Sequence, residues 1–133
     1  MEVTRERKPT RRGPGENFTG TVWQDQVAAN EAPSRVRSVI VHFEPGARTA
    51  WHRHPFGQVL HVLEGEGRAQ GAGAPVEVIR AGDTVHFQPG ERHWHGAGPS
   101  RFMTHIAIQE ADDDGVAATW EEHVSDQDYR AGE

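Results

Sequence analysis

The sequence predicts an all-β fold, a small single-domain barrel, on three observations. Short stretches rich in β-branched and aromatic residues recur at regular spacing and end at Gly or Pro turns, which is typical of a sandwich or barrel. The 133 residues include 15 glycines and 8 prolines, a composition that favours many short elements over a few long helices. No helical repeat interrupts the pattern. A chain of this length indicates one domain with a core of its own.

The predicted strands are separated by turns rich in Gly and Pro. In chain order they span residues 18–24, 36–43, 48–54, 58–63, 68–70, 76–79, 84–87, 92–96, 101–109 and 120–124. Residues 25–34 are expected to be irregular, because Pro33 bars a continuous helix. The run E-G-E-G at 64–67 is expected to turn the chain back.

The two ends of the chain differ from the barrel in composition. We expect a basic arm at 1–15, the barrel at 16–125 and a tail at 126–133. The arm is interpreted as a solvated tail or an edge strand lent to a partner, with an anion-binding role as the alternative. Ser125, followed by Asp128, is typical of a capping box at a short C-terminal turn.

Composition and charge exclude several classes of function. The net charge of -6 argues against a nucleic-acid partner. Without cysteine there are no disulfides, thiolate metal sites or cysteine nucleophiles. No apolar run approaches the roughly 20 residues that span a bilayer, and the basic N-terminus lacks the apolar region of a signal peptide. A cytoplasmic protein without membrane contact is therefore expected.

Residues 46–65, G-A-R-T-A-W-H-R-H-P-F-G-Q-V-L-H-V-L-E-G, contain the first histidine pair. His52 and His54 are two apart, so on a strand both imidazoles point to one face. Gln58 follows four residues later with the same parity. This stretch offers two ring nitrogens and one neutral amide oxygen to a common interior.

A second pair, His93 and His95, follows the turn Q-P-G at 88–90. Two strands that present histidines to one interior can assemble a site of three nitrogens, with Gln58 as oxygen donor. Such a donor set suits Mn²⁺, Fe²⁺, Ni²⁺ or Zn²⁺, and we expect one divalent metal per chain.

The other histidines and the large outward residues are interpreted from their positions along the strands. His105 lies in the apolar stretch F-M-T-H-I-A-I and shares strand parity with Ala107 and Gln109. Trp51 and Trp94 alternate with the candidate ligands, so they should point outward and pack on a second sheet or a subunit. Four histidines without a partner pattern are expected to be structural or on the surface: His42, His61, His86 and His123. Arg48 is expected to be a surface charge.

Two motifs resemble those of the cupin superfamily. The first is Gly46, five residues, His52-x-His54, three residues, Gln58 in place of the usual Glu, six residues and Gly65. The second runs from Gly82-Asp83 through Pro89-Gly90 to His93. Together they cover residues 46–97. The resemblance implies a single-domain cupin, which is a small double-stranded β-helix or jelly-roll barrel.

A narrower resemblance is to the bacterial manganese-dependent cupin hydroxynitrile lyases. It rests on F-E-P-G-A-R-T-A-W-H-x-H-P-x-G-Q, P-G-E-x-H-W-H-G-A, M-T-H-x-A-I-Q-E and W-x-E-H-V. It implies manganese as the metal, held by His52, His54, Gln58 and His93. It also implies catalytic roles for His105 and His95, and a substrate pocket lined by Val39, Val41 and Gln109.

The residues are compatible with cleavage of a cyanohydrin into aldehyde and cyanide. Gln58 in place of a carboxylate leaves the site one charge more positive, which makes a bound metal a stronger Lewis acid. His95 and His105 are expected to titrate near neutrality and to serve as acid and base. We expect His105 to be the base, because it lies off the strand that carries the metal ligands.

Two other functions remain open from the residues. One is a metal-dependent dioxygenase or isomerase of the wider superfamily, and the other is a non-catalytic module that binds a small polar ligand. His105 argues against the second, because burying an idle imidazole needs a partner to offset its cost. A small-molecule substrate and a homodimer or homotetramer are expected, since barrels of this size often pair through an open edge.

Overall fold

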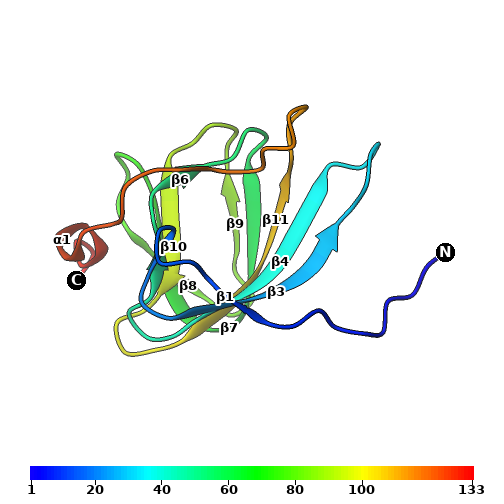
Figure 1. The fold of residues 1–133 in the computed structure, drawn as a ribbon. Helices are drawn as coiled ribbons and strands as arrows, with labels where there is room; N and C mark the ends of the chain where they lie inside the picture. Colours follow the sequence, from blue (N-terminus) through cyan, green and yellow to red (C-terminus); the bar gives the residue numbers. More distant parts are fainter.

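The computed structural model describes residues 1–133 as a single curled sheet with a short C-terminal helix (Figure 1). The elements are β1 (Arg11–Arg12), β2 (Phe18–Thr19), β3 (Val22–Ala29), β4 (Val36–Phe43), β5 (Arg48–Thr49), β6 (His52–Arg53), β7 (Gln58–Gly71), β8 (Glu77–Arg80), β9 (Thr84–Phe87), β10 (His93–Ala97), β11 (Met103–Glu110), β12 (Thr119–Trp120) and α1 (Asp126–Tyr129). The all-β prediction is confirmed. The helix α1 lacks the length that a membrane crossing requires.

Strand β7 belongs to both halves of the curled sheet. The strand order is β1-β3-β4-β11-β7-β10-β5-β2, and β6, β8, β9 and β12 attach to this path. The first part of β7 pairs with β11 and β9, and the second part pairs with β10 and β8. The two halves thereby face each other, and the side chains between them form the interior (Figure 1).

The core follows from the alternation of side chains along the central strands. On β11, His105 and Ala107 are buried while Ile108 is exposed, and on β7 Leu60 and Val62 are buried while Leu63 is exposed. A main cluster of 13 buried hydrophobic residues includes Phe43, Leu60, Val62 and Met103. Each strand therefore has one face in the barrel and one outside.

Two predictions about the strands are wrong. Residues 25–34 are not wholly irregular, because β3 continues to Ala29 and pairs with β4 along its length. The run 64–67 does not reverse the chain, because β7 is continuous through it. Gly65 has φ +81° and lies against the Phe102 carbonyl, so the backbone bends there and passes from β11 to β10.

The N-terminal arm contributes a strand to its own chain. Arg11 and Arg12 pair with Gln24 and Trp23 at the edge of β3. Residues 1–10 are exposed and run beside β3 and β4 (Figure 1), and the Thr10 hydroxyl donates to Asp25 at 2.5 Å. The predicted strand at 18–24 is divided into β2 and β3 at Gly20, whose φ is +81°.

The C-terminal tail packs on the outside of the barrel. Ser125 caps α1 by accepting a hydrogen bond from the Asp128 backbone N–H, as the capping box predicts. Trp51 and Trp94 point out of the barrel as expected, but they are buried in a second cluster with Val124 and Tyr129. The tail thus covers the outer face of the strands that carry the histidine pairs.

Arg48 is not the surface charge that the sequence led us to expect. It is 5% exposed, because the tail lies over it. Its Nη2 donates to the Val124 carbonyl and to Asp126, both at 2.8 Å, and its guanidinium lies 4.5 Å from the centre of the Tyr129 ring. The expectation is wrong because Tyr129, 81 positions later in the sequence, packs over the Arg48 side chain.

The Tyr129→Phe variant is expected to unfold about 1 kcal/mol more readily than the parent. The Tyr129 hydroxyl donates to the Ala97 carbonyl at 2.6 Å, and Phe leaves that carbonyl on β10 without its partner. Urea unfolding at equilibrium measures the difference, with an unchanged slope showing that the same surface is exposed. A midpoint equal to that of the parent contradicts the role of this bond.

Candidate metal centre and substrate cavity

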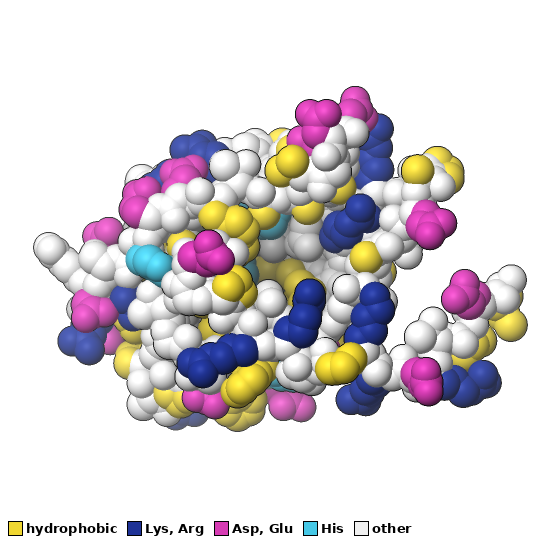
Figure 2. Space-filling model, in the orientation of Figure 1, with side chains coloured by type: hydrophobic (Ala, Val, Ile, Leu, Met, Phe, Trp, Pro, Cys, Tyr) yellow, Lys and Arg dark blue, Asp and Glu magenta, His cyan; other side chains and the backbone are white.

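A cavity of about 150 Å³ opens between the two halves of the sheet. Apolar side chains and histidines line the hollow (Figure 2). Its lining consists of Phe18, Gln24, Val39, Val41, Phe43, Thr49, His52, His54, Gln58, His95, His105, Ala107, Gln109, Ala117, Ala118 and Trp120. Every residue predicted for the substrate pocket and for catalysis is among them, together with three of the four predicted metal ligands.

Three histidines share one arrangement of their Nδ1 atoms. The Nδ1–H of His52 donates to the Ala50 carbonyl at 2.9 Å, that of His54 to Ala117 at 2.6 Å, and that of His93 to Glu91 at 2.8 Å. A backbone carbonyl on one nitrogen is the usual partner of a metal-binding histidine, because it fixes the tautomer and the ring. In each ring the Nε2 lone pair is then available to a cation.

Gln58 faces His93 with its oxygen. The Gln58 Nε2 donates to the Gln109 Oε1 at 3.0 Å, which orients the amide, and Gln58 Oε1 lies 3.0 Å from the Nε2 of His93. Since His93 already donates through Nδ1, a neutral ring presents a lone pair to this oxygen. Two acceptors at this distance repel each other unless a cation lies beside both, so these residues fit a divalent metal.

A fourth imidazole, that of His95, adjoins the predicted ligands. One nitrogen each of His52, His93 and His95 lie within 4.8 Å of one another. The ring centre of His54 lies 5.0 Å from that of His52 and 5.4 Å from that of His93, and its Nε2 is buried without a partner. The imidazole rings of both histidine pairs therefore surround one point.

His95 and His105 form a pair at the inner end of the cavity. The Nε2 of His105 lies 3.0 Å from the Nδ1 of His95, so one of these atoms donates a hydrogen to the other. The His95 Nε2 and the His105 Nδ1 are both buried without a partner. His95 therefore differs from the carbonyl-bonded rings, since its second nitrogen contacts another titratable side chain.

Burial keeps all five imidazoles neutral. It lowers the pKa of His93 and of His105 to about 3, lowers the pKa of His54, and holds those of His52 and His95 well below the ordinary value. The prediction that His95 and His105 titrate near neutrality is wrong, because both rings are removed from water. At pH 7 each ring is a neutral imidazole, with one N–H and one nitrogen free to accept a proton.

The metal-free protein is expected to lose stability as the pH falls below about 6.5. The folded-state pKa of His93 and of His105 is about 3, below that of an unfolded histidine, so the unfolded chain binds protons first. The stability that depends on keeping these rings neutral is fully present above about pH 6.5, and it is lost as the pH falls from 6.5 to about 3. Each such group contributes up to about 1.4 kcal/mol per pH unit in that window. Urea unfolding in chelator at pH 7.5 and 5.5 measures this, and equal stabilities contradict it.

Sequence reasoning missed the aromatic residues that frame the site. Trp120 stacks on His52 with ring centres 4.5 Å apart, and Phe87 stacks on His93 at 3.7 Å. Trp120 also lies 5.8 Å from Phe18 at the cavity wall. The pairing of β12 with β6, which brings Trp120 there, joins residues 68 positions apart and leaves no local signal in the sequence.

The remaining histidines lie outside the cavity. His61 contacts the Thr84 hydroxyl at 2.9 Å, and His42 lies between Asp25 and Thr104. His123 contacts Thr19, and His86 is exposed. All four lie away from the candidate metal centre, as expected for structural or surface residues.

Known proteins share this architecture. Residues 39–106, which are 68 of the 133, match the protein family described as Cupin domain. The chain belongs to the cupin family. This cupin is 55% identical over 119 residues to the (R)-mandelonitrile lyase of Granulicella tundricola, and the match covers 90% of each chain.

Solved structures confirm the cupin fold along the whole chain. A cupin-like protein from Thermotoga maritima is 36% identical, with a TM-score of 0.87 over 98% of this cupin and 97% of that chain. A polyketide cyclase from Streptomyces resistomycificus is 16% identical, with a TM-score of 0.71 over 97% of this cupin and 91% of that chain. The second likeness shows the fold alone.

Proposed function

We propose that this cupin is a metal-dependent hydroxynitrile lyase that reversibly cleaves cyanohydrins such as mandelonitrile into aldehyde and cyanide. The observation that carries the proposal is the facing pair of acceptors, Gln58 Oε1 and His93 Nε2, beside a cavity that also contains the His95–His105 pair. The extensive identity to an (R)-mandelonitrile lyase supports the same reaction.

The proposed ligands are His52, His54, Gln58 and His93, with one divalent cation per chain. The three histidines share the carbonyl-bonded Nδ1, whereas His95 has its Nδ1 on His105. The donor set suits manganese, which we propose, as well as iron, nickel or zinc. A divalent cation at this site supplies Lewis acidity and lowers the pKa of a substrate hydroxyl next to it.

The His95–His105 pair moves the proton. Both rings are neutral, and each has an unpartnered nitrogen, so one of them accepts the hydroxyl proton of the cyanohydrin. The oxygen electrons form the C=O bond, the C–CN bond breaks, and cyanide leaves with its electron pair. The imidazolium then returns the proton, which gives HCN. The 3.0 Å contact between the rings shares the transient charge, so the pair acts as a unit.

The size and polarity of the cavity favour an aryl substrate. A dry apolar cavity of about 150 Å³ accommodates benzene, and this one has a similar volume with Phe18, Val39, Val41 and Trp120 in its wall. Gln109 is a polar residue of the wall, and its side-chain oxygen accepts a hydrogen bond that orients Gln58. One aromatic ring thus fits between the apolar side chains, with the reacting carbon toward the histidines.

Cleavage of mandelonitrile tests the function. The manganese-loaded protein is expected to release benzaldehyde, followed by its absorbance, together with an equal amount of cyanide. Oxygen uptake with a catechol-like substrate is the control for the dioxygenase alternative, and no uptake is expected. Release of benzaldehyde no faster than in buffer, with oxygen uptake instead, would assign the site to oxygenation.

We also infer that the chain forms a homodimer or homotetramer. The outer face of the sheet exposes Trp23, Leu63 and Ile108, from β3, β7 and β11. Strands β7 and β11 are paired, and exposed apolar residues that share a face of a sheet favour association. Sedimentation velocity measures the mass, and a monomer at micromolar concentration contradicts the inference.

A further inference from the structure

Residues 117–122, here called the strap, lie across the segment that carries the first histidine pair. Within the strap, β12 pairs with β6 so that Trp120 is opposite His52. The Trp51 N–H donates to the Glu122 carbonyl at 2.9 Å, and the Glu121 N–H donates to the Trp51 carbonyl at 2.8 Å. The strap is therefore an added edge of the sheet at the metal centre.

The inner side of the strap contacts two of the proposed ligands. The Ala117 carbonyl accepts from His54 Nδ1 at 2.6 Å, and the Trp120 ring stacks on the His52 ring at 27°. A displacement of the strap would change the orientation of both imidazoles.

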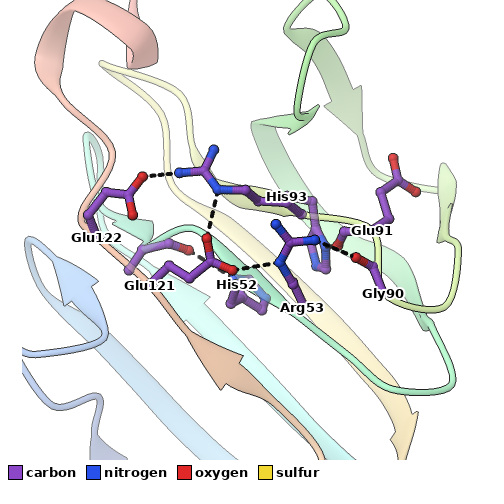
Figure 3. A network of polar contacts seen from close by, with 9 residues as sticks. His52, Arg53, Gly90, Glu91, His93, Glu121 and Glu122 are labelled. Carbon is purple, nitrogen blue, oxygen red and sulfur yellow. Dashed lines mark hydrogen bonds and ion pairs between the residues drawn. The ribbon is translucent and has the colours of Figure 1, made fainter.

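On its outer side the strap carries the Glu121 carboxylate, which bonds to both segments that contain proposed ligands. Glu121 Oε2 accepts from Arg53 Nε at 2.6 Å, and its Oε1 accepts from Arg92 Nε at 2.8 Å. Arg53 lies between His52 and His54, and it also donates to the Gly90 carbonyl at 3.0 Å; Figure 3 shows Glu121 and Arg53 beside the two ligand-bearing segments. Arg92 directly precedes His93.

The two guanidinium groups keep Glu121 ionised. Their hydrogen bonds lower the pKa of its carboxyl, Arg53 having the larger effect. The Glu121 side chain is 25% exposed and that of Arg92 is 23% exposed, and the Arg92 guanidinium lies 4.1 Å from the centre of the Trp51 ring. The Glu122 carboxylate pairs with Arg92 and not with Arg53, and its side chain is 66% exposed. A carboxylate shared by two ordered arginines orders its partners more than an isolated surface pair does.

We propose that Glu121 is a positioning residue for the metal centre, which holds the His52–His54 segment and His93 at the spacing that the cation requires. It touches neither the proposed ligands nor the cavity, and it acts through the residues next to them. The inference rests on the metal site proposed above. Supporting groups around a metal typically contribute 10–100-fold to its affinity, so a group one step further out is expected to contribute about tenfold.

The Glu121→Gln variant tests this, because Gln keeps the shape and removes the charge. We expect its dissociation constant for Mn²⁺, measured from the electron paramagnetic resonance signal of free Mn²⁺, to rise about tenfold. The Arg53→Gln variant, at an exposed side chain, is expected to raise it by a similar factor and provides the test if Glu121→Gln does not fold. Glu122→Gln is the matched control and is expected to stay within twofold of the parent.

The melting temperature of the metal-free proteins separates positioning from general stabilisation. The positioning role predicts that Glu121→Gln melts near the parent without metal and gains less from saturating Mn²⁺. Equal Mn²⁺ affinities for parent and Glu121→Gln would overturn the role of Glu121 alone. A parent that binds no Mn²⁺ would overturn the metal site and this inference together.

Discussion

Alanine at His95 or at His105 is expected to lower kcat for mandelonitrile cleavage by about 10²–10⁴-fold, the usual contribution of a positioned acid–base group. Each substitution removes one ring of the pair joined at 3.0 Å, so the proton has no second imidazole to share its charge. Because the two rings act as a unit, the double variant is expected to be no slower than the slower single variant. Steady-state kinetics of the three proteins, each loaded with Mn²⁺, measures this.

Metal content separates lost acid–base chemistry from a lost metal. The two variants are expected to bind Mn²⁺ with at least a tenth of the parent's affinity, because neither ring is a proposed ligand. His61→Ala is the control, since that ring lies outside the barrel on the Thr84 hydroxyl. Losses that multiply in the double variant would show two independent groups, and full turnover in His105→Ala would remove that residue from the mechanism.

Alanine at His54 is expected to abolish turnover through loss of the metal. The ring is held by the Ala117 carbonyl, with its Nε2 buried and unpartnered. Loss of a direct ligand should weaken Mn²⁺ binding by more than the roughly 10–100-fold that supporting groups contribute. Calorimetric titration with Mn²⁺ measures the affinity, and the cleavage assay measures the activity that remains.

The exposed His86 provides the matched histidine-to-alanine control for that experiment. His86→Ala is expected to bind Mn²⁺ and to turn over as the parent does, because its side chain lies outside the cavity. If His54→Ala kept the parent's affinity, His54 would not be a ligand and His95 would become the candidate for the third nitrogen.

Local patterns in the sequence were sufficient to predict the interior of the barrel. Strand parity alone placed His52, His54 and Gln58 on one face, and it placed His105 with Gln109. Parity works there because successive side chains of a strand point to opposite faces, and only one face of each strand lines the barrel interior. Val39 and Val41 in the cavity wall were expected from the resemblance to the hydroxynitrile lyases and not from parity.

Contacts between distant segments were not predictable in this way. Glu121 meets Arg53 and Arg92 from 68 and 29 residues away, and Tyr129 covers Arg48 on the outside of the barrel. The low pKa of His105 also depends on burial by several strands at once. The Glu121 and Tyr129 contacts arise from packing of the C-terminal segment, which has almost no regular structure of its own to reveal its place.

A crystal structure of the protein grown with Mn²⁺, with anomalous diffraction collected to locate the ion, tests the central claim most directly. We predict one anomalous peak per chain, about 2 Å from the Nε2 atoms of His52, His54 and His93 and from the Oε1 atom of Gln58. A peak that contacts His95 in place of His54, or no peak among these side chains, would contradict the proposed centre.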